Sequence, residues 1–448
     1  MLSKKIRYTI LIIIVIILGT SQLQDMQFII PIAVVLFAFL ICTQSVIEDF
    51  YCFVCLIPYL SIFSINDIGV TFLFFLISSI KLLISNSEKI KDQHIIVALI
   101  IILIIESSND LLKCSFGETL SPISYILYFS FFILFAPLKK INSSKLIAFF
   151  VIGLITVQIF SIIQAGGLTG LISNLDNTDI KIRLGETDTE KNYGNNLGGA
   201  MGFPIYSIML ICIAYKFIIT NKDKIYRILI ISFIIFEIII TLFTLSRVFF
   251  LGLSMFFICV IISVIQSKKG VLMLLFFIMI VAITYFYVDN SANILLEKYQ
   301  KRGNDDISTG RFQIYYDSLE YLLNNFRAIF IGDGIIGYRR VGESLSKQFS
   351  MSAHNLYLDI IMSVGIIGFI CLFSILKSLF KKAKEQIKGK ATIITAMPFI
   401  CYVIMENAGG SINDAKQYIY FLVLTIYIYS HKEHIYHLLY QFIMLRNT

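Results

Sequence analysis

Long apolar runs, separated by short polar connections, repeat along the whole chain. Runs such as 228–245, 248–265 and 271–288 approach the roughly 20 residues that an α-helix needs to cross the hydrocarbon layer of a bilayer. Backbone polar groups in lipid must pair within their own segment, so apolar runs of this length form helices. The pattern therefore predicts an all-α integral membrane protein.

The apolar runs predict about fourteen transmembrane helices in a single polytopic membrane domain over residues 1–448. Their expected ranges are 8–23, 27–45, 49–65, 69–85, 94–106, 121–137, 145–165, 200–220, 225–244, 246–266, 270–289, 354–380, 391–406 and 415–430. The fifth and the thirteenth are short for a crossing and also fit tilted or re-entrant segments.

Basic residues in the short connections indicate how the chain is oriented. With Lys4, Lys5 and Arg7 in the cytoplasm, alternation of the spans places every short lysine-rich connection on the cytoplasmic side, as the positive-inside rule requires. Those connections carry Lys89, Lys91, Lys139, Lys140, Lys145, Lys222, Lys224, Arg227, Lys268, Lys269 and the basic run 377–390. Both termini are then cytoplasmic, and two long loops, 166–199 and 290–352, are external.

The large external loop, 290–352, contains an amphipathic segment. Apolar residues at helical spacing predict a helix that lies on or near the outer membrane surface and packs on the bundle. These residues are Phe312, Tyr315, Leu319, Leu322, Leu323 and Phe326. The preceding Ser-Thr-Gly at 308–310 can cap the start of that helix.

Composition agrees with the membrane class and limits the partners. The chain is 57% hydrophobic with a mean hydropathy of +0.83, whereas a soluble domain rarely exceeds half apolar. The net charge of +8 arises from basic connections that membrane topology requires, so a nucleic-acid partner is not expected. The eight cysteines show no disulfide framework. Cys52 and Cys55 have the spacing of a redox pair, but their apolar surroundings favour a packing role.

The arginines are distributed against the rule that the lysines follow. Seven of the ten fall on the expected external side, namely Arg183, Arg247, Arg302, Arg311, Arg327, Arg339 and Arg340. A guanidinium is a flat, permanently charged fork that binds phosphate oxygens in two places, which lysine cannot do. An external arginine cluster beside lipid therefore suggests a diphosphate ligand. The alternative is salt bridging to external acids such as Glu186, Asp305 and Glu343.

Two of these arginines stand apart because of their positions. Arg247 lies between two apolar runs at the external boundary of the bilayer, where a charge is costly unless it pairs or serves a function. Arg311 lies at the expected N-terminus of the amphipathic helix, where its charge and the unpaired backbone amides can hold the same anion. Both are candidates for binding a phosphate group.

The segment from Gly332 to Gly337 spells the G-x-G-x-x-G pattern of dinucleotide sites. Such a site needs a cytoplasmic βαβ unit and an acidic residue further along the chain, whereas this segment is expected to be external. We therefore exclude the nucleotide interpretation. Gly332 and Gly334 are expected to form a tight turn beside a bulky ligand.

His354 stands at the start of the twelfth expected span and is the one histidine on the expected external side. An imidazole can take a proton from a sugar hydroxyl at neutral pH, which makes this residue a candidate general base. The alternative is an interfacial histidine that caps its own helix.

In their order and spacing, these motifs resemble the O-antigen polymerase and ligase superfamily. The motifs, in chain order, are Ser246-Arg247, Gly310-Arg311, Gly332-Asp333-Gly334, Ala353-His354-Asn355 and Val364-Gly365. The resemblance covers residues 183–375 and includes a preceding external loop around Arg183, which lacks the Asn-Pro-Asn that many members carry. Such proteins are multi-spanning glycosyltransferases of the bacterial cytoplasmic membrane. They have a GT-C-like helical bundle and use sugar chains carried on undecaprenyl diphosphate.

The resemblance implies a division of roles among the external residues. The residues that would bind or neutralise the lipid diphosphate are Arg183, Arg247 and Arg311. His354 would be the general base toward the acceptor hydroxyl, with Asp333 and Glu186 as reserve candidates. Further candidates for contacting the substrate are Arg302, Gly332, Asp333, Gly334, Arg339, Arg340 and Asn355. Because the diphosphate is already a good leaving group, transfer would need no metal and no cofactor.

A polymerase and a ligase share these motifs, and the absence of a distinctive acceptor domain favours a polysaccharide polymerase. Such an enzyme joins repeat units on undecaprenyl diphosphate into O-antigen or capsular polysaccharide. The closest alternative is an O-antigen ligase, which transfers the finished chain to lipid A-core or to a protein. A transporter or flippase for lipid-linked sugars would need more charge within the spans than Glu237, Asp359 and Glu406, and an internal repeat. The expected partners are lipid-linked oligosaccharides and the bilayer. A chain-length regulator and a flippase are further candidates.

Overall fold

The structure, a computed structural model, describes the chain in segments. The described residues are 3–23, 27–60, 63–65, 68–85, 93–106, 108–109, 143–170, 199–220, 223–244, 246–265, 311–334, 355–386, 397–398 and 400–405. Helices dominate these segments, as expected for an all-α chain. Two strands of two residues each form the β structure of the described part.

The N-terminal helix group contains the first helices of the chain and one later helix. Its helices are α1 (Lys4–Leu23), α2 (Ile30–Thr43), α3 (Val46–Leu56), α4 (Val70–Ser85) and α7 (Ser143–Gln164). Its short elements are η1 (Gln27–Ile29), η2 (Ile57–Tyr59), β1 (Ser64–Ile65) and β2 (Ile68–Gly69). The two strands are antiparallel, with Ser64 opposite Gly69 and Ile65 opposite Ile68.

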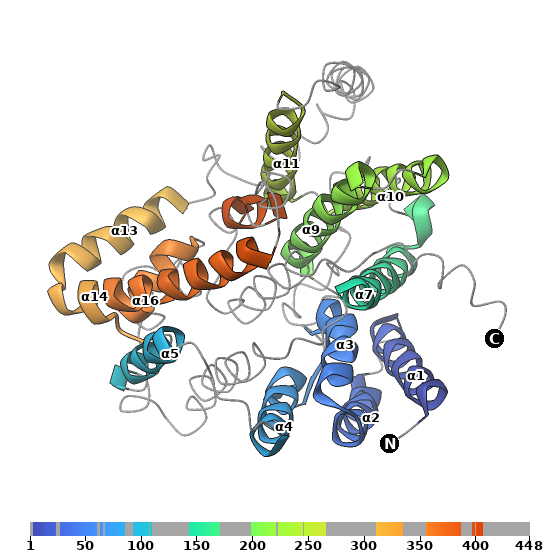
Figure 1. Ribbon diagram of the computed structural model, residues 1–448, viewed down its shortest axis with the longest axis horizontal. Helices are drawn as coiled ribbons and strands as arrows, with labels where there is room; N and C mark the ends of the chain where they lie inside the picture. The colour runs from blue at the N-terminus through green and yellow to red at the C-terminus, as the bar shows by residue number, and fades with distance from the viewer. Residues whose placement is uncertain are drawn as a thin grey trace.

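Two further groups complete the described part. The second contains α9 (Gly199–Thr220), α10 (Lys224–Leu242) and α11 (Arg247–Ile265). The third contains α5 (Gln93–Glu106), α13 (Arg311–Asn324), α14 (Phe326–Ile331) and α16 (Leu356–Gln386). Figure 1 shows the third group on one side of the molecule and the N-terminal helix group on the other.

Most expected spans within the described residues match a helix to within a few residues, as α9 and α11 do. The third span, expected at 49–65, differs, because α3 ends at Leu56. Pro58 has no N–H to donate and its ring crowds the preceding turn, so the chain passes into the 3-10 turn η2. The spans expected at 121–137, 270–289 and 415–430 lie outside the described residues, so the number of fourteen stays a prediction.

The described helices carry apolar side chains on their outer surfaces. One of them, Lys145–Gln164, is both long and apolar enough to cross a membrane. Shorter apolar stretches are Ile30–Thr43, Val70–Ile84, Phe203–Ile219, Val248–Ser263 and Tyr357–Cys371. On α10 the exposed apolar residues include Ile225, Ile228, Leu229, Ile235 and Ile239. Such rows are unfavourable in water and favourable in lipid, so the described part is consistent with a membrane protein.

The helices α3 and α7 run parallel. Near their starts, Lys145 Nζ donates to Glu48 Oε1 at 2.6 Å. Further along, the Tyr59 hydroxyl donates to Thr156 Oγ1 at 3.0 Å. Spans three and seven are both expected to run outward from the cytoplasm, so their relative direction agrees with the expected alternation. Which end is cytoplasmic stays a prediction.

Charged side chains gather where several helix ends meet in this group. Lys81 of α4 forms a 2.7 Å salt bridge with the buried Asp49, and it also donates to the carbonyl of Gln44 at 2.8 Å. Arg7 of α1 lies 3.9 Å from the carboxylate of Glu48. We call Arg7, Glu48, Asp49, Lys81 and Lys145 the charged end cluster. The end of α4 therefore meets the start of α3, as alternating spans require.

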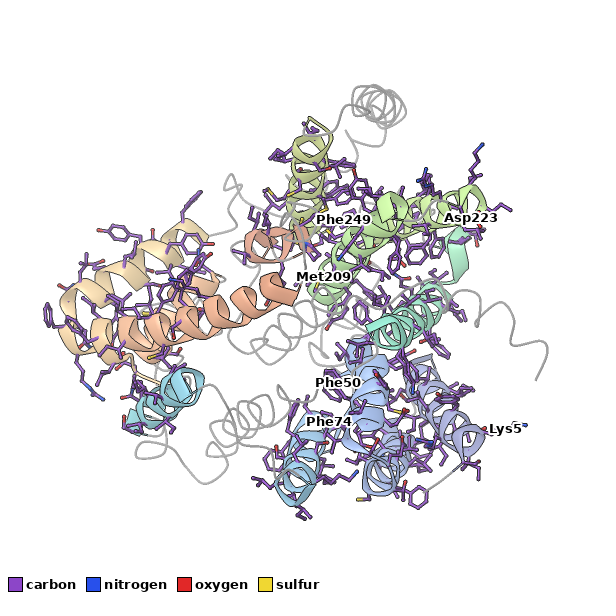
Figure 2. All side chains as sticks on the ribbon, in the orientation of Figure 1. Lys5, Phe50, Phe74, Met209, Asp223 and Phe249 are labelled. Carbon is purple, nitrogen blue, oxygen red and sulfur yellow. The ribbon has the colours of Figure 1, made fainter. Side chains whose placement is uncertain are left out.

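Aromatic stacking and close backbone approach fill the interior of this group. The rings of Phe53 and Phe74 stack with centroids 4.1 Å apart and planes 6° apart, and Figure 2 shows Phe74 inside the group. Gly153 lets α7 approach α3, because a Cβ there would overlap the carbonyl of Cys55. Cys52 and Cys55 are both buried, which agrees with a packing role.

The helix expected around Phe312–Phe326 is present as α13, which ends at Asn324. After the non-helical Asn325 the chain continues as α14. Asn325 has a non-helical φ of −127° and ψ of 86°. The buried side of α13 consists of Ile314, Ser318 and Leu322. Four of the apolar residues that predicted the helix are exposed, namely Phe312, Leu319, Leu323 and Phe326. Apolar spacing identified the helix, but it could not tell a face against protein from a face against lipid.

Candidate active site

The two leading arginine candidates both begin helices. Arg247 is the first residue of α11, and Arg311 is the first residue of α13. The first turn of a helix has unpaired backbone N–H groups and a partial positive charge, so both positions suit an anion. The structure describes the backbone of these two residues and not their side chains, so their contacts with a phosphate stay predictions.

Several expected site residues lie outside the described residues. These are Arg183, Glu186, Arg302, Arg339, Arg340 and His354, together with the expected cap at 308–310. Their roles stay predictions. Within the part of the chain that the structure describes, no three histidine, cysteine, aspartate or glutamate side chains come together as a metal site would need.

Asn355, which follows His354, is the N-cap of α16. Its Oδ1 accepts hydrogen bonds from the backbone N–H of Tyr357 at 3.0 Å and of Leu358 at 3.2 Å. Its own carbonyl accepts from the N–H of Asp359 at 2.9 Å. These bonds satisfy donors that the first turn of a helix leaves unpaired. His354 is therefore joined directly to a well-capped helix start.

The glycine segment 332–334, expected to form a tight turn, is hydrogen-bonded to α16, and its backbone adopts no regular turn. The N–H of Asp333 donates to the carbonyl of Met362 at 2.9 Å, and the N–H of Gly334 donates to the carbonyl of Ser363 at 2.8 Å. These carbonyls lie directly before a kink at Gly365, where α16 leaves helical geometry. The N–H groups of this segment thus donate to carbonyls at the kink, which would accept hydrogen bonds from within α16 if that helix were regular.

Gly332 and Gly365 cross each other in the same conformation. Gly332 has φ 65° and ψ −174°, and Gly365 has φ 67° and ψ −176°, a region that is essentially open to glycine alone. A Cβ on Gly332 would overlap the carbonyl of Ser363, and a Cβ on Gly365 would overlap the carbonyl of Phe330. Contact between two backbones explains these glycines. Whether the segment also touches a ligand stays a prediction.

The carboxylate of Asp333 is buried and held from α13. The Tyr321 hydroxyl donates to Asp333 Oδ2 at 2.8 Å, and Asn325 Nδ2 donates to the Tyr321 oxygen at 2.9 Å. Partial burial of Tyr321, followed by its hydrogen bond to Asp333, raises the pKa of the Tyr321 hydroxyl to about 12. The hydroxyl is therefore protonated at neutral pH and donates a hydrogen bond to Asp333.

A second polar link joins the end of α5 to the same segment. Asn109 Nδ2 donates to the carbonyls of Ile331 at 2.9 Å and Gly332 at 3.3 Å. Asn109 Oδ1 accepts from Arg327 Nη2 at 2.7 Å. Arg327 was considered as a salt-bridge or ligand residue, and the structure gives it an amide partner. Asn109 could not be predicted from the sequence, because a single asparagine after an apolar run carries no distinguishing signal.

The contacts around this segment unite parts of the chain that are far apart in sequence. We call α5 with Asn109, α13, α14, the segment 332–334 and α16 the glycine-crossing unit. It joins the helix that begins at Arg311 to the helix capped by Asn355. Arg247 begins a helix that packs on α9 in the second group, and its approach to Arg311 stays a prediction.

A buried carboxyl lies outside this unit. Glu237 of α10 is fully buried, and its Oε2 accepts a hydrogen bond from Gln158 Nε2 of α7 at 3.0 Å. Glu237 is one of the few acids within the expected spans, and the sequence alone does not indicate its partner. The bond links the N-terminal helix group to the second group. A polar pair within an apolar bundle is a strong restraint on register, because either partner alone would be costly.

Comparison with protein families gives a match over part of the chain. Residues 230–373 match the family described as O-antigen ligase. The matched segment contains α11, α13, α14 and the start of α16, and with them the positions of Arg247, Arg311 and His354. It confirms the resemblance over these residues, whereas Arg183 precedes the match. Comparison with curated proteins finds no matching relative.

Proposed function

We propose, from the premise that residues 230–373 are a segment of the O-antigen ligase family, that this chain is a polysaccharide polymerase. It would transfer a growing glycan from undecaprenyl diphosphate onto the next lipid-linked repeat unit, at the outer side of the bacterial cytoplasmic membrane. The product would be O-antigen or capsular polysaccharide. The family match itself supports O-antigen ligase or polymerase activity and does not separate the two.

The observation that supports the arginine and histidine roles, which polymerase and ligase would share, is the crossing of segment 332–334 with α16. Through it, the helix that starts at Arg311 and the helix capped at Asn355 belong to one unit, although 44 positions separate those two residues. A catalytic arginine and a catalytic histidine must keep a fixed spacing, because small misplacements of reacting groups lower rates strongly. Two glycine backbones in contact would give the helix starts at Arg311 and Asn355 such a fixed spacing.

The reaction would proceed by displacement at the anomeric carbon of the donor sugar. The bond from that carbon to the diphosphate oxygen breaks, and undecaprenyl diphosphate leaves with the electron pair. Arg247 and Arg311 would stabilise the charge that develops on the diphosphate. His354 would accept the proton of the acceptor hydroxyl as its oxygen forms the new glycosidic bond. The chain's own residues supply charge, orientation and a proton acceptor in this scheme.

A ligase is the second candidate, and it is the activity that the description of the matched family names. The two activities differ in the acceptor, which is a lipid-linked repeat unit for the polymerase and lipid A-core or a protein for the ligase. The donor half of the site would be the same. The arginine and histidine roles therefore apply to both, and the products must separate them.

Analysis of lipid-linked products in a strain lacking this protein tests the proposal. Loss of a polymerase leaves single repeat units on the lipid carrier and at the surface. Loss of a ligase leaves long chains on the lipid carrier. We expect single repeat units, and accumulation of long lipid-linked chains would replace the polymerase with the ligase.

Single substitutions test the site when each variant is expressed in the strain that lacks the wild-type protein. Arg247→Ala, Arg311→Ala and His354→Ala are each expected to abolish long chains while the protein still reaches the membrane. Glu320→Ala is the matched control for Arg311→Ala, because Glu320 is an exposed polar residue of the same helix. Normal chain length in all three site variants would refute the assignment of these residues.

A further inference from the structure

A row of apolar side chains is exposed along α13 and α14. Its members are Tyr316, Leu319, Leu323, Phe326 and Phe330, which we call the apolar stripe. They recur every three or four residues, so those on α13 lie on one side of the helix. Leu323 is 77% exposed and Phe326 is 73% exposed, which is far from the burial that large apolar side chains normally reach in protein.

The helix α13 presents three different faces. The first is buried in the protein and contains Ile314, Ser318 and Leu322. The second is polar and exposed, with Gln313, Glu320 and Asn324. The apolar stripe forms the third face. A helix at a protein surface in water needs only the first two, so the third points to a further apolar environment.

The apolar stripe ends next to the outside of α16. The backbone of Phe330 lies against Gly365, and the residues that follow, Ile366 and Ile367, are exposed on α16 together with Ile370. This part of α16 belongs to the apolar stretch Tyr357–Cys371, within the twelfth expected span. Figure 1 shows α13 and α14 beside α16 at the edge of the molecule. The end of the stripe at Phe330 therefore lies next to exposed apolar residues of this span.

We propose that the apolar stripe inserts α13 and α14 into the acyl chains at the surface of the bilayer, with the polar face of α13 toward water. The position of the stripe next to the expected span favours lipid as the partner. The aromatic share of the stripe also suits the boundary between acyl chains and headgroups. On the basis of the proposed function, this contact sets the height of Arg311 relative to the phosphates of lipid-linked substrates.

Tryptophan fluorescence can test this contact directly, because the chain contains no tryptophan. We would introduce Leu319→Trp and, separately, Leu323→Trp into the full-length protein. Glu320→Trp is the matched control on the polar face, one position away. Ile235→Trp, at an exposed position of α10, is the reference for a side chain in lipid. Each variant is reconstituted into phosphatidylcholine vesicles with and without bromine on the acyl chains.

For Leu319→Trp and Leu323→Trp we expect short-wavelength emission and loss of most fluorescence to brominated lipid, as for Ile235→Trp. For Glu320→Trp we expect long-wavelength emission, strong quenching by aqueous acrylamide and little quenching by brominated lipid. Because all of these positions are exposed, the substitutions need not disturb the core.

Two results would overturn the inference. Acrylamide quenching of Leu319→Trp and Leu323→Trp equal to that of Glu320→Trp would place the stripe in water. Protection of Leu319→Trp and Leu323→Trp from both acrylamide and brominated lipid would place the stripe against protein. A second copy of the chain is the first such partner to consider, because apolar residues repeated every three or four positions also suit helix pairing. None of these readouts uses enzymatic activity, so failure here is distinguishable from failure of the proposed function.

Discussion

The N-terminal helix group and the glycine-crossing unit are held together in different ways. In the first, stacked aromatic rings fill the interior and the charged end cluster ties the helix ends together. In the second, the small core of Ile314, Leu322, Ala328 and Met362 is supplemented by backbone hydrogen bonds across the glycine crossing. Side-chain packing adapts to substitution, whereas two backbones in contact leave room for glycine alone. The glycine-crossing unit, which contains the helix starts at Arg311 and Asn355, should therefore tolerate fewer substitutions than the N-terminal helix group.

The largest effect is expected for Gly332→Val. The new side chain would overlap the Ser363 carbonyl and would force a conformation that only glycine adopts, at a cost of at least about 3 kcal/mol. We expect loss of folded protein or of long polysaccharide chains. Fluorescence-detected size exclusion and chain-length analysis measure the two outcomes.

Gly167→Ala is the control for this substitution. Gly167 also has a positive φ, of 80°, but a Cβ there would meet nothing within 4 Å. It therefore isolates conformational strain from overlap and should cost about 1 kcal/mol. Equal losses of thermal stability in the two variants would show that the crossing is not as tight as described.

In the charged end cluster, Lys81→Met should cost about 3 kcal/mol, because it leaves the fully buried Asp49 without its cation. Lys145→Met is the matched case, since its partner Glu48 has a side chain that is 27% exposed, and about 1 kcal/mol or less is expected there. Unfolding midpoints in one detergent compare the two. A larger loss for Lys145→Met would reverse the ranking of the two ion pairs.

Tyr321→Phe removes the donor to Asp333 and should cost about 1 kcal/mol. The pKa of Tyr321 is raised from 10 to about 12, so the contribution of its hydroxyl is fully present below pH 10 and is lost as the pH rises toward 12. The difference in unfolding midpoint between wild type and Tyr321→Phe should be constant near neutral pH and shrink in strong alkali. A difference that grows with pH would contradict the donor role.

The smallest structural effect concerns Asn355. Asn355→Ala should cost about 1 kcal/mol through loss of the N-cap, whereas Asn355→Ser keeps a capping oxygen and should be nearly neutral for stability. If Asn355 also contacts substrate, as the resemblance implies, the serine variant will be stable but will make shorter chains. Normal chain length in the serine variant would restrict Asn355 to capping.

The sequence predicted most of the described helices well because each is encoded locally by a run of apolar residues. It also singled out Gly332 and Gly334, both of which have a positive φ. It did not predict the partner of Gly332, because Gly365 lies 33 positions from Gly332 and looks like any glycine in an apolar run. Asn109 was missed for the same reason. The early end of α3 could have been predicted from Pro58. The face of α13 that packs on protein could not, because apolar residues also lie on an exposed face of this helix.

The most direct test of the central claim is the reaction of the purified protein in lipid nanodiscs with single repeat units on undecaprenyl diphosphate as the only sugar substrate. A polymerase needs no other acceptor. We expect a ladder of lipid-linked products with two, three and more repeats, together with released undecaprenyl diphosphate, and no ladder with His354→Ala. Donor that stays unreacted until lipid A-core or an acceptor protein is added would contradict the claim and identify a ligase.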